Sequence, residues 1–198
     1  TLTDLDVPEG AKCIRIGFRP KGKGVFIVHS VMLGDTAYDM SGSGCFLSRS
    51  DVLVLANHYP SPEDLYRNMF VHKRMMWYKR NGHVFDVMRM HQNAEETYRE
   101  FEGINIVEGQ TQTLASILQS GQIKTVCVHF LDRMMWNVLK DYSKQLKIIV
   151  WSHGADIQPY YRRDFEYKSE QEKAKAKKAS DERMSLWNEI FANLSQYP

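Results

Sequence analysis

The chain lacks the features of several common protein classes. Among its 198 residues there are three cysteines, Cys13, Cys45 and Cys127, and none belongs to a Cys-x-x-Cys pair. An odd number of widely spaced cysteines does not make a disulfide framework, so we expect reduced thiols in a cytoplasmic protein. No apolar run approaches the roughly 20 residues that a membrane-spanning helix needs. The sequence therefore predicts neither a disulfide-stabilised secreted domain nor a membrane-spanning protein.

The charge of the chain is nearly balanced. Its 26 basic and 24 acidic side chains leave a net charge of +2, which is too weak by itself to indicate nucleic-acid binding. Hydrophobic residues make up 43% of the chain, enough to bury a core, so a disordered protein is not expected. No signal peptide is visible, and the start at Thr1 leads us to expect that an upstream part has been cut away.

Several cofactor and catalytic motifs are also missing. No Gly-x-Gly-x-x-Gly follows the first predicted strand, which argues against a dinucleotide-dependent oxidoreductase and leaves that class as the weakest of three alternatives. There is no His-Glu-x-x-His segment or cysteine cluster to indicate a metal site, and no Gly-x-Ser-x-Gly to indicate a hydrolase. We therefore expect no metal and no cofactor.

What the sequence does contain is a strand, helix, strand pattern within residues 51–89. Residues 52–56 form a continuous apolar run, as in a strand that is buried on both faces of a parallel sheet. A helix is predicted over 61–82, and a second apolar run follows at 84–88. A strand that returns after one helix runs parallel to the first, so a right-handed βαβ unit is predicted.

The predicted helix has recognisable ends. Ser61 is a favourable N-cap, Pro62 suits the first helical position, and Asp64 completes a start similar to a capping box. Gly82, after Asn81, provides a left-handed stop. The apolar face that we expect this helix to bury consists of Leu65, Met69 and Met76, flanked by Tyr66, Phe70 and Trp77.

Strands and helices continue to alternate after this unit. The further predicted elements are a strand at 104–107, a helix at 113–121, a strand at 125–131, a helix capped by Asp132, and a strand at 146–151. This alternation predicts an α/β fold with a doubly wound, mostly parallel, Rossmann-like sheet.

Residues 1–48 differ in character from the rest. Residues 13–19 alternate between apolar and polar positions, and 25–33 form a second strand-like run, so a β-hairpin is predicted. A lone hairpin is barely stable, and we expect this one to end a preceding β-sandwich or to pack on the following domain. A Ser-Gly linker is predicted at 35–50, and residues 49–198 form the second predicted domain.

The C-terminal region is rich in charge. Residues 166–183 form a helical tract with a lysine-rich centre, which usually marks a solvated helix face. Attraction to anionic lipid or glycan, and thus peripheral membrane contact, is the alternative. An apolar stripe at 186–194 predicts that this helix packs on another element. Because no strand follows before Pro198, we expect the chain to be truncated.

Candidate site residues follow the ends of two predicted strands. In open α/β sheets, ligands bind outside the carboxyl ends of the strands. The residues that follow the first and the last strand are Asn57, His58, Tyr59, His153, Gly154 and Asp156. The imidazole of His153 adjoins a glycine that permits close approach of a ligand, and a plain surface turn is the alternative.

The start of the predicted helix contributes further candidates. Tyr66, Arg67 and Asn68 lie where polar side chains can face the same crevice, and Arg67 can pair with an anionic ligand or remain a solvated helix charge. His72 shares the apolar face of the helix and His129 lies within an apolar strand, so we interpret both as packed, satisfied interior histidines.

Two segments resemble a known family. The first is Leu-Ala-Asn-His-Tyr-Pro-Ser-Pro-Glu-Asp-Leu-Tyr-Arg-Asn-Met-Phe-Val-His-Lys-Arg at 55–74, followed by Trp-Tyr-Lys-Arg-Asn-Gly-His at 77–83. It resembles the N-terminal half of family 4 retaining glycosyltransferases of the two-Rossmann GT-B type. Ser-His-Gly-Ala-Asp at 152–156 is similar to that family's His-Gly-x-Glu segment. The resemblance covers residues 50–198.

The resemblance implies the acceptor-side domain of an enzyme of polysaccharide biosynthesis. Such an enzyme moves a sugar from a nucleotide-sugar to a glycan or lipid-linked acceptor with retention, and His153 would lie near the transferred sugar as a catalytic residue. Residues 57–68 would contact the acceptor or the donor diphosphate. The loop lacks the Gly-Gly pair common in the family, and the C-terminal donor domain is missing, so the chain alone is expected to be inactive. The alternative is a non-catalytic α/β carbohydrate-binding or interaction module.

Overall fold

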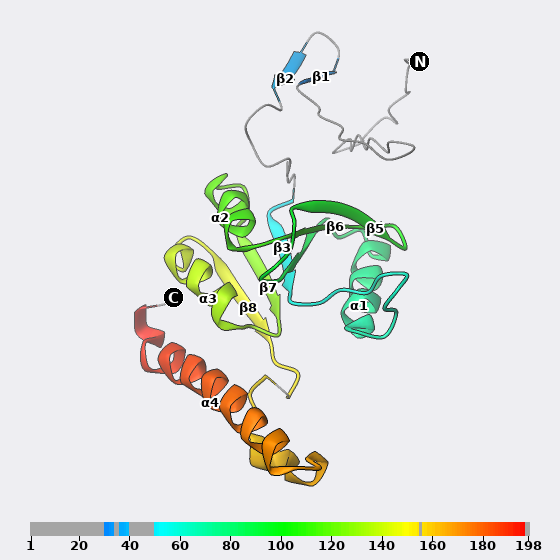
Figure 1. Cartoon of the computed structure of the whole chain (residues 1–198). Helices are drawn as coiled ribbons and strands as arrows, with labels where there is room; N and C mark the ends of the chain where they lie inside the picture. Colours follow the sequence, from blue (N-terminus) through cyan, green and yellow to red (C-terminus); the bar gives the residue numbers. More distant parts are fainter. Residues whose placement is uncertain (1–29, 34–35, 40–49, 155, 197–198) are drawn as a thin grey trace. The chain divides into compact units, whose positions relative to one another are not determined.

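The computed structural model describes residues 30–33, 36–39, 50–154 and 156–196 (Figure 1). The chain divides into two units, Thr1–Arg49 and Ser50–Pro198, which are described separately. In the first unit, strands β1 (Ser30–Leu33) and β2 (Thr36–Asp39) pair in antiparallel orientation. β1 belongs to the strand expected at 25–33, whereas β2 falls in the stretch expected to be a linker. The strand expected at 13–19 lies outside the described residues.

The second unit is a six-stranded sheet flanked by helices (Figure 1). Its strands are β3 (Val52–Ala56), β4 (Asp86–Met90), β5 (Thr97–Phe101), β6 (Ile104–Gly109), β7 (Thr125–His129) and β8 (Lys147–Trp151). Its helices are α1 (Met69–Arg80), α2 (Thr111–Gln119), α3 (Arg133–Leu139) and α4 (Glu170–Ala192), with 3₁₀ turns at Lys140–Tyr142, Tyr160–Glu166 and Leu194–Gln196. The strand order is β5-β6-β4-β3-β7-β8, and every neighbouring pair is parallel except β5 and β6. The predicted Rossmann-like α/β fold is confirmed.

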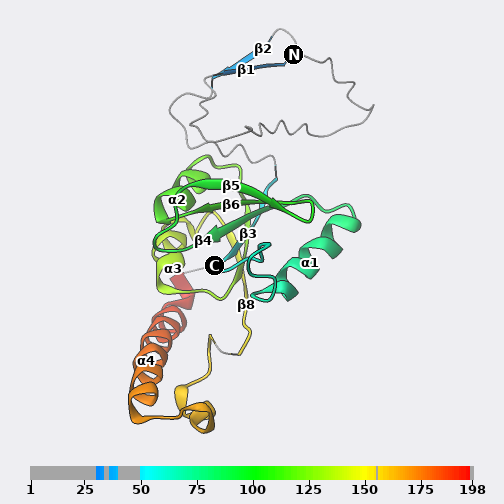
Figure 2. The same cartoon turned by 45° about the vertical axis from the view of Figure 1, so that its right-hand side comes forward.

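The connections place the helices on opposite faces of the sheet. The chain passes from β3 through α1 to β4 on one side, and later returns across β3 through α2 to β7 and through α3 to β8. Right-handed crossovers made in opposite directions put their helices on opposite faces. Accordingly, α1 lies on one side of the sheet, and α2 and α3 lie on the other in both views (Figures 1 and 2). The direction in which successive strands are added to the sheet therefore reverses at β3. In open α/β sheets, ligand sites form at such a reversal point.

The core is built on β3 and its parallel neighbours. Leu53, Leu55 and Ala56 are fully buried, as expected for a central strand covered on both faces. Val54 and Val87 are partners in register and pack with Val71 of α1 in one hydrophobic cluster. Because side chains alternate along a strand, residues two positions further along β3 and β4 lie on the same face as α1.

Helix α1 begins at Met69, eight residues after the expected start at Ser61, so that prediction is wrong. The Ser61 hydroxyl does accept from the Asp64 N–H (3.2 Å), as a cap would, but the two residues also exchange both backbone hydrogen bonds at 3.1 Å. This closes a tight turn in place of a first helical turn. The chain then enters the helix through Asn68 in the left-handed conformation (φ 56°), which asparagine tolerates better than most residues.

The buried face of α1 also differs from the expected one. The residues of this helix that are fully buried are Val71, His72 and Met75, whereas Phe70 and Trp77 are exposed. Met69 and Met76 are only partly buried against the core. Apolar side chains surround much of this helix, so their spacing does not define one face. The interpretation of His72 as a packed interior histidine is confirmed.

The sequence pattern also missed strand β5. It forms an antiparallel hairpin with β6, and the connecting residues Glu102 (φ 47°) and Gly103 (φ 74°) both have positive φ. This is the backbone of a type I′ turn, which matches the twist of the paired strands. Glu-Gly is a weaker signal than Asn-Gly or Asp-Gly, and most of β5 is exposed and polar.

The second half of α4 holds this long helix to the domain. Leu186, Trp187 and Ile190 are buried, which confirms that this helix packs on another element, and the Trp187 indole N–H donates to the Asp156 carbonyl (3.0 Å). Phe191 and Leu194, at the end of the predicted stripe, are exposed, so that part of the prediction is wrong. In the lysine-rich half, Lys173 pairs with Asp164 and Lys177 pairs with Asp181. Within the described part of the chain, no helix has the length and apolar character required to cross a bilayer.

Candidate active site at the carboxyl edge of the sheet

Polar and aromatic side chains form one row across the carboxyl edge of the sheet. The strand pairing aligns Trp151, His129, Ala56, Arg89 and Glu108 on β8, β7, β3, β4 and β6. Residues in register point to the same face, and this row lies two positions beyond the apolar residues that pack under α1. The row therefore marks the point where the core ends and the candidate site begins.

Two histidines meet at the β7 and β8 end of this row. His129 has no exposed surface, and its Nδ1 lies 2.9 Å from Nε2 of His153. The two rings are almost parallel, with centroids 5.2 Å apart. The indole of Trp151 also stacks with His129, at 6.1 Å and an interplanar angle of 6°. His129 is thus interior as expected, but its Nε2 is buried without a hydrogen-bond partner, so it is not fully satisfied.

Helix α1 and the residue after β7 supply the surroundings of His153. The ring of Phe70, in the first turn of α1, lies 4.8 Å from the imidazole, and Phe130, directly after β7, lies 4.5 Å away. One turn further along α1, the Arg74 guanidinium stands 4.1 Å from the centroid of Trp151. His153 is therefore held among aromatic rings from two different segments and remains partly exposed.

Both imidazoles are kept in their neutral form. Burial lowers the pKa of His129 to about 4, and the positive charges that His153 and Arg74 can place beside it act in the same direction. Burial also lowers the pKa of His153; Asp156 opposes this shift and Arg74 reinforces it. At neutral pH the contact between the two rings is consequently one hydrogen bond between uncharged imidazoles.

The turn that carries His153 is fixed from within. Gly154 has φ 83°, a conformation that a side chain would strain. The Asp156 carboxylate is buried, and its Oδ1 accepts from the His153 backbone N–H (2.9 Å) and from the Ser152 hydroxyl (3.4 Å). Of the candidates after β8, His153 is therefore the side chain positioned toward the edge, and Asp156 shapes the turn.

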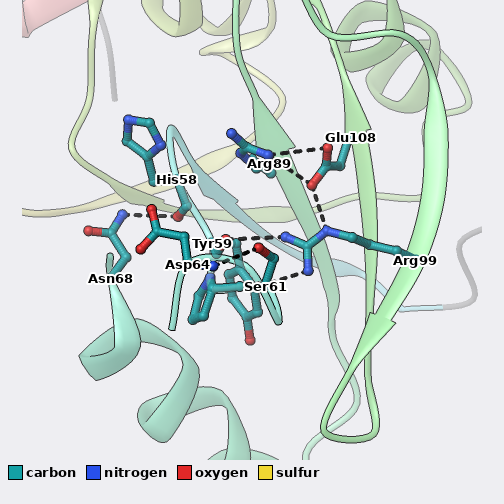
Figure 3. A network of polar contacts seen from close by, with 9 residues as sticks. His58, Tyr59, Ser61, Asp64, Asn68, Arg89, Arg99 and Glu108 are labelled. Carbon is teal, nitrogen blue, oxygen red and sulfur yellow. Dashed lines mark hydrogen bonds and ion pairs between the residues drawn. The ribbon is translucent and has the colours of Figure 1, made fainter. Parts of the chain in front are cut away.

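A second group of polar residues holds the loop after β3 (Figure 3). Glu108 accepts from Arg99 Nε (2.6 Å) and from Arg89 Nη1 (3.1 Å). The same Arg99 guanidinium donates to the carbonyls of Pro60 (2.8 Å) and Tyr59 (3.2 Å). These contacts connect β4, β5 and β6 to the loop at 57–60 and so fix the position of this loop at the carboxyl edge of the sheet.

Replacing Glu108 by glutamine should lower the free energy of unfolding by about 2 kcal/mol. Breaking a fully buried pair costs roughly 3–5 kcal/mol, and here the side chains of Arg89, Arg99 and Glu108 are 25%, 23% and 14% exposed, which screens part of that cost. Burial alone would raise the pKa of Glu108, but hydrogen bonds and charge from Arg99 and Arg89 lower it overall. Urea unfolding measures the effect.

The matched control for this substitution is Glu100→Gln, an exposed carboxylate on β5. We expect that variant to stay within about 0.5 kcal/mol of the wild type, as surface substitutions usually do. Equal effects of the two substitutions would show that the Arg89 and Arg99 pairs do not stabilise the edge.

Three of the predicted binding residues lie together in the loop after β3. The Asn68 amide nitrogen donates to the His58 carbonyl (2.9 Å) and reaches the Asn57 side-chain oxygen (3.4 Å). Burial, followed by the charges of Arg67 and Arg89, lowers the pKa of His58. Like His153, His58 is thus biased toward the neutral form, which can both donate and accept a hydrogen bond.

Tyr59 points into the protein and not toward the edge. Its hydroxyl lies 2.9 Å from His72 Nδ1, and His72 Nε2 lies 3.0 Å from the Glu102 carboxylate. Tyr59 is 4% exposed and His72 is 1% exposed, so this chain of contacts connects the loop, α1 and the β5–β6 turn. The side chain of Tyr59 supports the loop, and only its backbone carbonyl faces Arg99.

The remaining predicted residues, Tyr66 and Arg67, are exposed. The side chain of Tyr66 is 95% exposed, and that of Arg67 is 65% exposed and 3.9 Å from Asp64. Because the helix begins after them, they belong to a surface loop. Arg67 still lies close enough to His58 to lower its pKa, whereas the side chain of Tyr66 extends into solvent.

Sequence reasoning missed several residues that shape this edge. They are Arg74, Arg89, Arg99, Glu108 and Phe130. Each belongs to a different segment or to an unexpected strand, and each charge looks like an ordinary surface charge by itself. The one local signal was the departure from apolar character at the position before the last residue of two strands, at Arg89 and Glu108.

Within the described ranges, no group of three or more His, Cys, Asp or Glu side chains is arranged to hold a metal ion. The side chains at the edge offer hydrogen bonding by neutral imidazoles and amides, ring packing, and the charge of partly buried arginines. No family model matches the chain, and no curated protein matches it either.

Proposed function

We propose that the second unit is the acceptor-side domain of a retaining glycosyltransferase. In this role, the carboxyl edge of the sheet binds the sugar acceptor and one side of a nucleotide-sugar, and His153 contacts the sugar that is transferred. The loop at 57–60 and Asn68 contribute hydrogen bonds to ligand hydroxyls. Donor binding is completed by a further domain.

One observation carries this proposal. The two segments whose residues resemble that enzyme family, 55–83 and 152–156, are separated by about seventy residues, yet Phe70 of the first packs on His153 of the second at 4.8 Å. They meet at the carboxyl ends of parallel strands, where ligands bind in open α/β sheets. Two segments that resembled the family by chance would not be expected to come together at one ligand-binding edge.

The residues at the edge suit the chemistry of sugar transfer. Sugar ligands present hydroxyl oxygens that accept and donate hydrogen bonds, and neutral His153, His58 and Asn57 offer both kinds of group. Aromatic rings such as Phe70 and Phe130 supply apolar surface beside them. Holding the acceptor hydroxyl beside the donor carbon removes much of the entropic barrier to transfer.

The test is a transfer assay with the longest natural chain that contains these residues. Nucleoside diphosphate release is measured for a panel of uridine and guanosine diphosphate sugars, with neutral and anionic oligosaccharides as acceptors. We expect release that depends on the acceptor, with the anomeric configuration of the donor retained in the product. Oligosaccharide binding without turnover on any donor would instead support the non-catalytic binding module.

A further inference from the structure

The pair of histidines at the β7 and β8 edge has one unused buried atom. His129 Nε2 is completely enclosed and has no hydrogen-bond partner among the described residues, while Nδ1 of the same ring faces His153 Nε2 at 2.9 Å. A neutral imidazole carries a hydrogen on only one of its two nitrogens. The position of the hydrogen on His129 therefore decides what His153 can do.

Two arrangements of hydrogens are consistent with a neutral pair. If His153 donates through Nε2, then His129 accepts at Nδ1 and must carry its own hydrogen on Nε2. That N–H would be a buried donor without an acceptor, which costs about 1–3 kcal/mol. If His129 donates through Nδ1, its Nε2 carries only a lone pair and no donor is left unsatisfied.

Two charged side chains act on the histidine pair. The Arg74 guanidinium stands over Trp151, which stacks on the His129 ring, and it acts electrostatically on both histidines. The other charged group that acts on His153 is Asp156, whose carboxylate already accepts from the backbone of the turn.

We propose that His129 is a positioning residue that fixes His153 in the tautomer with its hydrogen on Nδ1. With Nε2 of His153 occupied as an acceptor, its Nδ1–H is the group left for a ligand. His153 then serves as a hydrogen-bond donor to a ligand oxygen, such as a sugar hydroxyl, and not as a base. The identity of the ligand rests on the proposed function, but the tautomer does not.

Nitrogen-15 NMR of the chain labelled at its histidines tests the tautomer without any substrate. In the wild type we expect His153 to show a protonated Nδ1 and an unprotonated Nε2 at pH 7.5, the reverse of the tautomer that free imidazole side chains prefer. His83, which is exposed, should show the usual tautomer with the hydrogen on Nε2. A wild-type His153 with its hydrogen on Nε2 overturns the inference.

Two substitutions, made in the longest natural chain for the activity measurements, separate positioning from packing. In His129→Asn, the amide nitrogen replaces Nδ1, so the tautomer of His153 should be retained and kcat/KM for transfer should fall less than about threefold. In His129→Phe, the ring remains but the donor is lost, so His153 should revert to the usual tautomer and kcat/KM should fall by about tenfold, as for other residues that orient a site residue. Combined with His153→Ala, the His129→Phe change should have no additional effect on kcat/KM.

Each outcome of this series decides one question. Equal loss of kcat/KM in the asparagine and phenylalanine variants, or a further loss in the double variant, would show that His129 acts by packing alone. A confirmed tautomer together with no transferase activity would leave the hydrogen-bond assignment standing and reject the proposed function.

Discussion

Replacing His153 by alanine in the longest natural chain should lower kcat/KM for sugar transfer by about 100-fold and leave the fold intact. The imidazole is the partly exposed group of the turn after β8, and it lies among rings of Phe70 and Phe130 at the edge where ligands bind. Loss of one preorganised donor to a reacting ligand typically costs 10²–10³ in rate. The initial rate of nucleoside diphosphate release measures the effect, and circular dichroism confirms that the fold persists.

The chain offers a matched control in His83→Ala. His83 is exposed and precedes β4, at the amino edge of the sheet and therefore opposite to His153. Its substitution should leave kcat/KM within about twofold of the wild type, since surface changes away from a site have small effects. If His153→Ala retained the turnover of His83→Ala, His153 would have no role at the reacting sugar.

The second large effect is a loss of stability in mild acid caused by His129. Its pKa is lowered in the folded state from 6.5 to about 4 because the ring is buried. A group with a lowered folded pKa binds more protons when unfolded, so its contribution to stability is complete above pH 6.5 and declines as the pH falls toward 4. Between pH 7 and pH 5 the linkage relation gives a loss of about 2 kcal/mol for this residue alone.

Urea unfolding at pH 7 and pH 5 measures this loss, and His129→Asn provides the comparison. His153 and His58 also have lowered pKa values and contribute with the same sign. The asparagine variant should therefore retain part of the pH dependence and lose about 2 kcal/mol of it. His129→Gln repeats the measurement if the first variant folds poorly. An unchanged pH dependence in both variants would contradict a buried neutral His129.

The fold was predictable because its signals are local. The apolar run at β3, the Asp132 cap and the glycine after α1 each predict a strand, a helix start or a helix end from a few neighbouring residues. All three predictions are confirmed: Val52–Ala56 is a strand, Asp132 accepts from the Met135 N–H at 2.9 Å, and Gly82 has φ 79°. A strand followed by a helix and another strand leaves almost no choice of topology. Strand β5 was not predicted because its Glu-Gly turn is a weak hairpin signal and most of its residues are polar and exposed.

The start of α1 was mispredicted because one local signal has two structural outcomes. Ser61 and Asp64 satisfy the same hydrogen bond in a helix cap and in a closed turn, and the choice depends on long-range contacts. Here Asn68 donates to the His58 carbonyl and Arg99 holds the loop from β5, so the turn is retained and the helix begins later.

The candidate site was only partly predictable because it depends on register. His58 and His153 could be chosen from their place after strands, but the row of Trp151, His129, Ala56, Arg89 and Glu108 exists only once five strands are aligned. A shift of one residue in any strand would turn its member of the row to the opposite face. No spacing along the chain contains that information.

The most direct test of the central claim is to map which edge of the sheet binds sugar ligands. Histidine imidazole resonances of the labelled chain are followed during titration with the oligosaccharide and nucleotide-sugar panel, because His58 and His153 report on the carboxyl edge and His83 reports on the amino edge. We expect at least one member of the panel to shift the resonances of His153 and His58 and to leave those of His83 unchanged. Shifts at His83 alone, or no shift with any ligand at millimolar concentration, would contradict it.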